Sequence, residues 1–201
     1  MIKVIFFDMF NVVFSGDFRK AIDKYEEEFK IKKGDLYKVI HDFQGWKDFS
    51  LGKISQEDFF KLCEYRAENF VFNGNYFFKL FRESIYSNQS VVDLIKYYSK
   101  NYIIGVISNA PREWYDVIIE DFDLEDIFKI RAVSGYLHLR KPDQEIFQKA
   151  LKLAGVNGDQ SIYIDDRGDR VDGAINLGMK VVIFDGDTEK LKNKMDILLD
   201  S

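Results

Sequence analysis

A set of polar side chains in this sequence stands at the ends of short apolar runs, directly or, for Lys141, after a short loop. The set comprises Asp8, Ser108, Asn109, Lys141, Asp165 and Asp166. In an open parallel sheet, ligands bind beyond the carboxyl ends of the strands, so residues in these positions converge at one edge. We therefore expect carboxylates, a hydroxyl and a lysine to lie close together.

This set of groups suits the transfer of a phosphoryl group. Clustered carboxylates repel one another unless a cation lies among them, and oxygen ligands with room for water suit Mg²⁺. Asp8 could then attack phosphorus and form an aspartyl-phosphate. Lys141 would neutralise the nucleophile and the phosphoryl oxygens, and Ser108 would donate its hydroxyl to one of them. The backbone amide of Asn109 would face the same anion near the N-terminus of the helix that Pro111 begins.

The apolar periodicity predicts the elements that must position these groups. Short β-rich runs alternate with helix-length amphipathic segments, which is the pattern of βαβ units. Strands are expected at residues 2–7, 102–107, 130–134, 161–165 and 180–184. The predicted fold class is therefore α/β, a doubly wound, Rossmann-like parallel sheet covered on both faces by helices.

The segment 14–86 has a different texture and shows helical patterns without a convincing strand. We expect an all-helical cap domain there, inserted into a core domain built from residues 1–13 and 87–201. The cap holds 12 of the 19 phenylalanines, enough for a small core of its own.

Composition excludes several classes of function. A formal net charge of −5, with both signs interleaved, argues against nucleic acid as a partner. The first apolar run is too short for a membrane span and lacks the flanks of a signal peptide. One cysteine, Cys63, leaves no internal disulfide, so we expect a cytoplasmic protein. The groups suited to phosphoryl transfer predict a small phosphorylated metabolite as its partner. The sequence indicates no oligomeric state.

The order and spacing of the motifs resemble the helical-cap subgroup of the haloacid dehalogenase-like (HAD) hydrolase superfamily. The four matching stretches are "FFDMFNVV", "VISN", "GYLHLRKPDQEIF" and "IYIDDRGDRVDGAINLGM". The insertion lies between the first two, and "WKDFSLGKISQEDF", residues 46–59, looks like part of such a cap. The resemblance implies that Asp8 is the nucleophile. It also implies a Mg²⁺ site formed by Asp8, the backbone carbonyl of Phe10, Asp165 and Asp166.

The sequence departs from the family pattern at Phe10. Phosphatases of this superfamily usually carry a second aspartate there, which protonates the leaving group and then deprotonates the attacking water. Phenylalanine can do neither, although its carbonyl remains available to a metal. Loss of general acid-base assistance slows a reaction by about a hundred- to ten-thousandfold but does not forbid it.

Three interpretations remain open. The first is a Mg²⁺-dependent phosphatase whose proton transfer is relayed by water or another group, or whose leaving group is good, such as an anomeric sugar phosphate. The second is a 2-haloacid dehalogenase, whose halide needs no proton, but that branch works without metal and generally lacks the pair Asp165-Asp166. The third is a weakly catalytic or non-catalytic protein that binds a phosphorylated ligand. The acid pair favours the first. Asp169 is a reserve candidate for a metal ligand.

Overall fold

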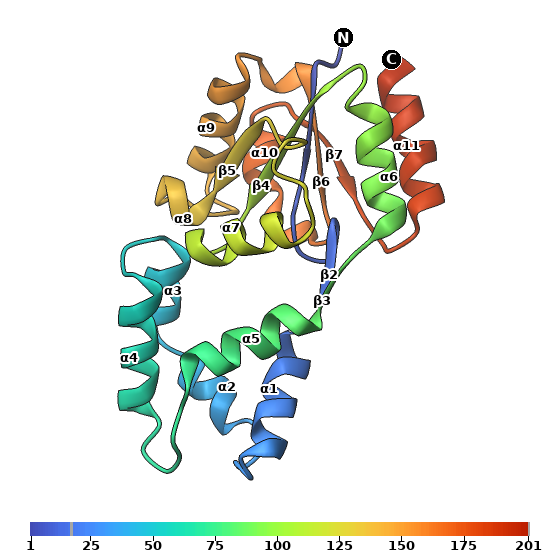
Figure 1. Ribbon diagram of the computed structural model, residues 1–201. Helices are drawn as coiled ribbons and strands as arrows, with labels where there is room; N and C mark the ends of the chain where they lie inside the picture. Colours follow the sequence, from blue (N-terminus) through green and yellow to red (C-terminus); the bar gives the residue numbers. More distant parts are fainter. Residues whose placement is uncertain (17, 201) are drawn as a thin grey trace.

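The computed structural model describes residues 1–16 and 18–200, and its centre is a five-stranded parallel sheet (Figure 1). The strands, in their spatial order, are β5 (Ile130–Val133), β4 (Ile103–Ser108), β1 (Val4–Phe7), β6 (Ser161–Asp165) and β7 (Lys180–Ile183). All five predicted strands are confirmed, and the predicted doubly wound α/β class with them.

Helices cover both faces of this sheet. One face packs against α6 (Gln89–Tyr98), α7 (Arg112–Asp121) and α11 (Thr188–Asp200). The other packs against α9 (Gln144–Ala154) and α10 (Asp172–Asn176). Because side chains alternate along a strand, β1 sends Ile5 and Phe7 to the first face and Val4 and Phe6 to the second. Both layers of apolar core thus hold β1 at the centre of the sheet.

A second group of helices lies beyond the carboxyl ends of the strands, at the bottom of Figure 1. It contains α1 (Phe18–Glu28), α2 (Asp35–Ile40), α3 (Gln44–Ser50), α4 (Gln56–Arg66) and α5 (Gly74–Ser84). Ser55 caps the N-terminus of α4, because its hydroxyl accepts a hydrogen bond from the Asp58 backbone N–H at 3.1 Å. Aromatic rings such as Phe49, Phe59 and Phe77 are fully buried among these helices. We call residues 14–86 the cap and the remainder the core.

The expectation that residues 14–86 lack strands was wrong. The strands β2 (Phe14–Gly16) and β3 (Ile85–Ser87) pair in antiparallel fashion at the junction of cap and core. Each is three residues long, which is too short to show an alternating pattern of apolar residues. Through the β2–β3 pair, the chain leaves the core after β1 and returns to it before α6.

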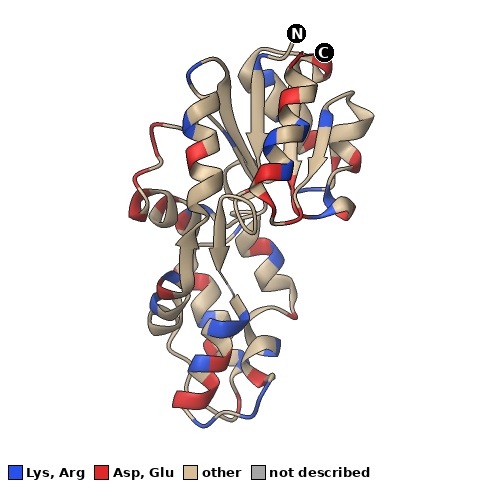
Figure 2. Cartoon of the chain, turned by 90° about the vertical axis from the view of Figure 1, so that its right-hand side faces the viewer, with Lys and Arg blue, Asp and Glu red and all other residues tan. Residues whose placement is uncertain are grey.

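Short elements complete the core. They are α8 (Ser134–Leu137) after β5, and two 3₁₀ turns, η1 (Gly158–Gln160) before β6 and η2 (Gly168–Arg170) after it. Acidic and basic side chains alternate over both cap and core in Figure 2, which agrees with the interleaved charges of the sequence. Within the part of the chain that the structure describes, no helix is both long and apolar enough to cross a membrane.

The cap is fastened to the core on the α7–α8 side by direct hydrogen bonds. Trp114 Nε1 donates to Gln56 Oε1 at 2.8 Å, and the Ser134 hydroxyl donates to the Ser50 carbonyl at 2.6 Å. Arg82 of α5 forms a two-pronged ion pair with Asp121 of α7, at 2.9 and 2.6 Å. Two of these three contacts come from residues 46–59, the stretch that resembles a family cap, so this stretch forms part of the cap–core seam.

Gly52 allows the closest approach across this seam. Its φ angle is +65°, and a Cβ atom placed on it would lie 2.1 Å from the Gly135 carbonyl oxygen of the core. A side chain at this position would therefore meet a strained backbone conformation and a fixed backbone atom together.

We expect Gly52→Ala to destabilise the protein more than a matched substitution elsewhere. Gly155 has a similar φ of +67° but nothing within 4 Å of its would-be Cβ, so Gly155→Ala measures the conformational cost alone, about 1–2 kcal/mol. The clash at Gly52 should add at least about 1 kcal/mol to the loss of unfolding free energy. Chemical denaturation of both variants measures the difference, and equal losses would contradict the close seam.

Candidate active site

Strand register places three of the predicted groups side by side. Phe7 of β1 pairs with Val106 of β4 and with Ile164 of β6. The next residue, Asp8, therefore lies level with Asp165, and its backbone N–H donates to the Ile164 carbonyl at 2.8 Å. Ser108 ends β4 one residue further along. The structure thus gathers Asp8, Ser108 and Asp165 at the carboxyl edge of the sheet, as predicted from the sequence.

Lys141 lies at the centre of this group, with only 2% of its side chain exposed. Its Nζ atom is 2.8 Å from Asp8 Oδ2 and 2.7 Å from Asp165 Oδ2. A buried ammonium group is costly unless it is paired, and here two carboxylates pair with it. One cation therefore bridges the candidate nucleophile and a second acid.

The backbone around Lys141 is fixed by Asn109. The Lys141 N–H donates to Asn109 Oδ1 at 2.8 Å, and Asn109 Nδ2 donates to the Lys141 carbonyl at 3.0 Å. The sequence suggested a contact between the Asn109 amide and the ligand. In the structure, the Asn109 side chain instead binds the backbone of Lys141 and so fixes the loop that carries the lysine.

Tyr163 is a member of the site that the sequence analysis missed. Its hydroxyl accepts a hydrogen bond from Lys141 Nζ at 2.8 Å and makes a short hydrogen bond to Asp165 Oδ2. Burial, reinforced by the charges of Asp8 and Asp165, raises the pKa of this hydroxyl well above 10, so it stays protonated. Its signal in the sequence was a polar aromatic residue two places before Asp165, on the same face of a buried strand.

Asp166 joins Asp8 and Asp165 to form a cluster of three carboxylates. One oxygen from each lies within 4.8 Å of the others. Burial raises the pKa of Asp8, with Lys141 opposing the rise and Asp165 adding to it. Burial also raises the pKa of Asp166, and the charges of Asp8 and Asp165 contribute. Mutual repulsion among oxygen donors is the situation that a bound divalent cation relieves, so these residues fit Mg²⁺.

The two acids of the pair differ in how many of their oxygens the protein already uses. Asp165 is fully buried; Lys141 and Tyr163 contact its Oδ2, and the Arg167 N–H donates to its Oδ1 at 2.8 Å. Asp166 is half-buried, and its Oδ2 accepts one hydrogen bond, from Asn11 Nδ2 at 3.0 Å. Asp166 therefore has more oxygen lone pairs free to bind a metal than Asp165 has. The reserve candidate, Asp169, instead binds Arg167 through both of its oxygens.

A small hollow of about 120 Å³ opens onto these groups. Its lining residues are Asp8, Phe10, Asn11, Ser108, Asn109, Lys141, Asp166, Arg167 and Arg170. The lining thus contains two carboxylates, Asp8 and Asp166, and both belong to the cluster described above. Phe10 is half-buried in this wall and packs against Phe81 of α5, with ring centroids 6.1 Å apart. No further acid among the lining residues could replace the aspartate expected at position 10.

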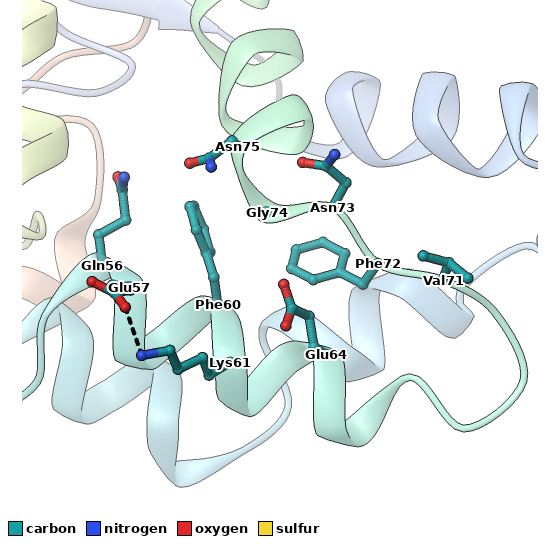
Figure 3. Close-up of a pocket in the computed structure, with 10 residues that line it drawn as sticks. All are labelled: Gln56, Glu57, Phe60, Lys61, Glu64, Val71, Phe72, Asn73, Gly74 and Asn75. Carbon is teal, nitrogen blue, oxygen red and sulfur yellow. Dashed lines mark hydrogen bonds and ion pairs between the residues drawn. The ribbon is translucent and has the colours of Figure 1, made fainter.

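A larger hollow of about 630 Å³ lies on the cap between α4 and the start of α5 (Figure 3). Two of its charged groups are engaged locally, since Lys61 pairs with Glu57 at 2.6 Å. Asn73 is engaged as well, because its side chain accepts a hydrogen bond from the Tyr76 backbone at the start of α5. This hollow lacks the converging catalytic groups found at the sheet edge, so we place the candidate site at the smaller one.

Two curated relatives with sequence similarity to this chain bear the names of a phosphatase and a hydrolase of phosphorylated compounds. Glyceraldehyde 3-phosphate phosphatase of Pyrococcus furiosus is 32% identical over 94 residues, which cover 45% of this chain and 38% of that protein. The match therefore spans well under two thirds of that relative's length. Flavin mononucleotide hydrolase 1 of Arabidopsis thaliana is 24% identical over 202 residues, which cover 98% of this chain and 78% of that protein.

Solved structures share the fold. A HAD family enzyme of Bacteroides thetaiotaomicron, in complex with magnesium and inorganic phosphate, superimposes with a TM-score of 0.82 at 18% identity. The alignment covers 95% of this chain and 99% of that one. The family model of haloacid dehalogenase-like hydrolases matches residues 2–178, which include the first three motifs, the fourth except for its last residue, and the inserted helices. The chain therefore belongs to the haloacid dehalogenase-like hydrolase family.

Proposed function

We propose that this protein is a Mg²⁺-dependent phosphatase that hydrolyses a small phosphate monoester through Asp8. The observation that carries this proposal is the buried Lys141 ammonium, which lies 2.8 Å from Asp8 beside two further carboxylates. Membership of a hydrolase family and similarity to named phosphatases support it. An anomeric sugar phosphate remains within this proposal.

The metal would be held by Asp8, Asp166 and the backbone carbonyl of Phe10. Asp165 would stand behind them, since its oxygens already serve Lys141, Tyr163 and the Arg167 backbone. When bound, Mg²⁺ supplies charge that offsets the repulsion between the carboxylates and the phosphate oxygens.

The chain's own groups account for the two chemical steps. Asp8 holds one oxygen toward Lys141, while its other oxygen accepts a hydrogen bond from the Met9 N–H at 2.7 Å. This fixes the carboxylate for attack on phosphorus, which breaks the bond to the leaving group and forms an aspartyl-phosphate. Lys141 and the Ser108 hydroxyl stabilise the charge on the transferring phosphoryl oxygens. Water then attacks the phosphorus and breaks its bond to the Asp8 oxygen, which regenerates the carboxylate and releases inorganic phosphate, the proton of the water passing to solvent.

Phe10 governs which leaving groups are accepted. Because the hollow offers no acid beyond the cluster itself, the leaving oxygen must depart with its charge or take a proton from water. We propose that residues 14–86 act as a cap domain over this step, and Phe10 supports this because its ring packs against Phe81 of the cap. The ring would shield the aspartyl-phosphate side of the hollow from bulk water.

The second candidate is a non-catalytic protein that binds a phosphorylated ligand. The observation that favours it is again Phe10, since the binding groups Lys141 and Ser108 are complete while the proton shuttle is missing. Turnover measurements separate the two candidates.

Asp8→Asn should abolish phosphatase activity while leaving the anion site in place. With p-nitrophenyl phosphate and Mg²⁺, we expect kcat to fall by at least about a thousandfold, because the nucleophile is lost. Vanadate, measured by calorimetry, should still bind through Lys141 and Ser108. If the unaltered protein binds vanadate but turns over no phosphate ester with or without Mg²⁺, the binding function replaces the enzymatic one.

Phe10→Asp should restore a proton shuttle. We expect kcat for an alkyl phosphate to rise about ten- to a hundredfold, and kcat for p-nitrophenyl phosphate to change much less, because its leaving group needs little protonation. Phe10→Asn is the matched control, since it loses the same contact with Phe81 but cannot donate a proton. Equal changes for both esters, or equal effects of Asp and Asn, would show that another group already supplies the proton.

Asp166→Asn and Asp165→Asn should fail in different ways. Calorimetric titration with Mg²⁺ should show at least about tenfold weaker binding for Asp166→Asn, with little loss of stability. Asp165→Asn should instead lower the unfolding free energy by about 3 kcal/mol, because it removes a carboxylate from the buried Lys141. Asp169→Asn, on an exposed acid paired with Arg167, is the control that leaves Mg²⁺ binding unchanged.

The Mg²⁺ titration should also depend on pH. Because the pKa values of Asp8 and Asp166 are raised, protons compete with the metal at higher pH than for ordinary aspartates. Affinity for Mg²⁺ in the unaltered protein should therefore fall as the pH is lowered through these raised values.

The comparison of Asp166→Asn with Asp165→Asn has a separate test. If both variants lost the same amount of Mg²⁺ affinity, the assignment of metal binding to Asp166 and of Lys141 pairing to Asp165 would be wrong.

A further inference from the structure

Arg170 lies in the wall of the catalytic hollow without an ion-pair partner. It is the last residue of η2, four residues after Asp166, and its side chain is half-buried. No carboxylate among residues 1–16 and 18–200 lies within 4.0 Å of its guanidinium. A half-buried arginine that lines a hollow and forms no ion pair is available to a ligand.

The residues around Arg170 form no ion pair with it in the described part of the chain. Asp169 is adjacent in sequence and its charge interacts favourably with Arg170, but both of its oxygens bind Arg167, at 2.9 and 2.7 Å. Burial lowers the pKa of Arg140, and the positive charge of Arg170 adds to this lowering. The two guanidinium groups therefore repel each other, and an added anion would relieve this repulsion.

Arg170 is separated from the groups that serve the reacting phosphate. Lys141 is paired with Asp8 and Asp165 at the point of attack, whereas Arg170 forms no ion pair with any of the three clustered carboxylates. The Lys141 ammonium beside the nucleophile is thus paired with carboxylates, while the Arg170 guanidinium in the wall of the hollow is not. The hollow is only about 120 Å³, so a ligand spanning both places must be small.

We propose that Arg170 binds a second anionic group on the substrate, so that the site selects small phosphate monoesters carrying a further carboxylate or phosphate a few atoms from the reacting phosphorus. This inference rests on the proposed phosphatase function and specifies its substrate class. The planar guanidinium suits either oxyanion, because its N–H groups can donate two parallel hydrogen bonds.

Three two-carbon phosphate monoesters test this, since they differ in the group that lies away from the reacting phosphate. They are 2-phosphoglycolate with a carboxylate, 1,2-ethanediol bisphosphate with a second phosphate, and 2-hydroxyethyl phosphate with a hydroxyl. For at least one anionic compound, kcat/KM should exceed that of hydroxyethyl phosphate by about tenfold. The compound with the larger preference identifies the group that Arg170 accepts.

Arg170→Met should remove this preference. We expect kcat/KM to fall about tenfold for the preferred anionic compound and less than about threefold for hydroxyethyl phosphate. Arg170→Lys, which keeps the charge but loses the planar fork, should give an intermediate value. Arg112→Met removes an exposed arginine outside this hollow and is the control that changes neither substrate. An equal loss on all three compounds would assign Arg170 to the reacting phosphate and overturn the proposal, as would no loss at all.

Binding to a catalytically inactive protein separates this inference from the proposed function. In the Asp8→Asn background, calorimetry compares phosphoglycolate, the bisphosphate and hydroxyethyl phosphate with Arg170 present or replaced by Met. Tighter binding of an anionic compound that is lost with Arg170→Met supports the inference even if the unaltered protein hydrolyses nothing. Equal affinities for the three compounds would overturn the inference while leaving the phosphatase function intact.

Discussion

The buried Lys141 ammonium is the interaction on which the rest of the site depends. With 2% of the side chain exposed, its charge is tolerable only because Asp8 and Asp165 lie within 2.8 Å. Those acids come from β1 and β6, and parallel pairing of the two strands brings them level. The lysine itself arrives on a loop that Asn109, just after β4, clamps by two hydrogen bonds. Sheet register and ion pairing therefore require each other, and an error in either would leave a charge buried without a partner.

The same arrangement explains why the cluster suits the divalent cation of the proposed function. Three carboxylates lie beside the one ammonium of Lys141, so their combined negative charge can exceed its positive charge. Burial and repulsion answer this by raising the pKa values of Asp8 and Asp166. Both oxygens of Asp165 already accept hydrogen bonds, from Lys141, Tyr163 and the Arg167 backbone. The carboxylate oxygens that remain free for a metal therefore lie on the side of Asp166 and the hollow. The lysine thus organises one half of the cluster and leaves the other half open to a metal.

Order along the chain was enough to predict the sheet and most of the site, because parallel strands bring their carboxyl ends to a common edge. Contacts made through side chains were not predictable in this way. The sequence gives no sign that Asn109 would clamp the Lys141 backbone, nor that the Tyr163 hydroxyl would reach Lys141 from a buried strand. The β2–β3 ribbon escaped because three-residue strands have no periodicity. The sequence analysis did not single out Arg170, since its lack of an acidic partner is visible only in three dimensions.

Selectivity is the point at which sequence and structure lead to different emphases. An inserted cap suggests that cap side chains choose the substrate, yet every residue lining the catalytic hollow belongs to the core. The cap is fastened along α7, with Gln56 bonded to Trp114 and Arg82 to Asp121. It contacts the wall of the hollow where Phe81 packs against Phe10 and where the Phe14 carbonyl accepts a hydrogen bond from the Asn11 N–H at 2.6 Å. The Phe10 ring occupies the position where a proton shuttle would otherwise lie. In the proposed function, the cap would therefore act on the chemistry through Phe10, while Arg170 of the core would discriminate between ligands.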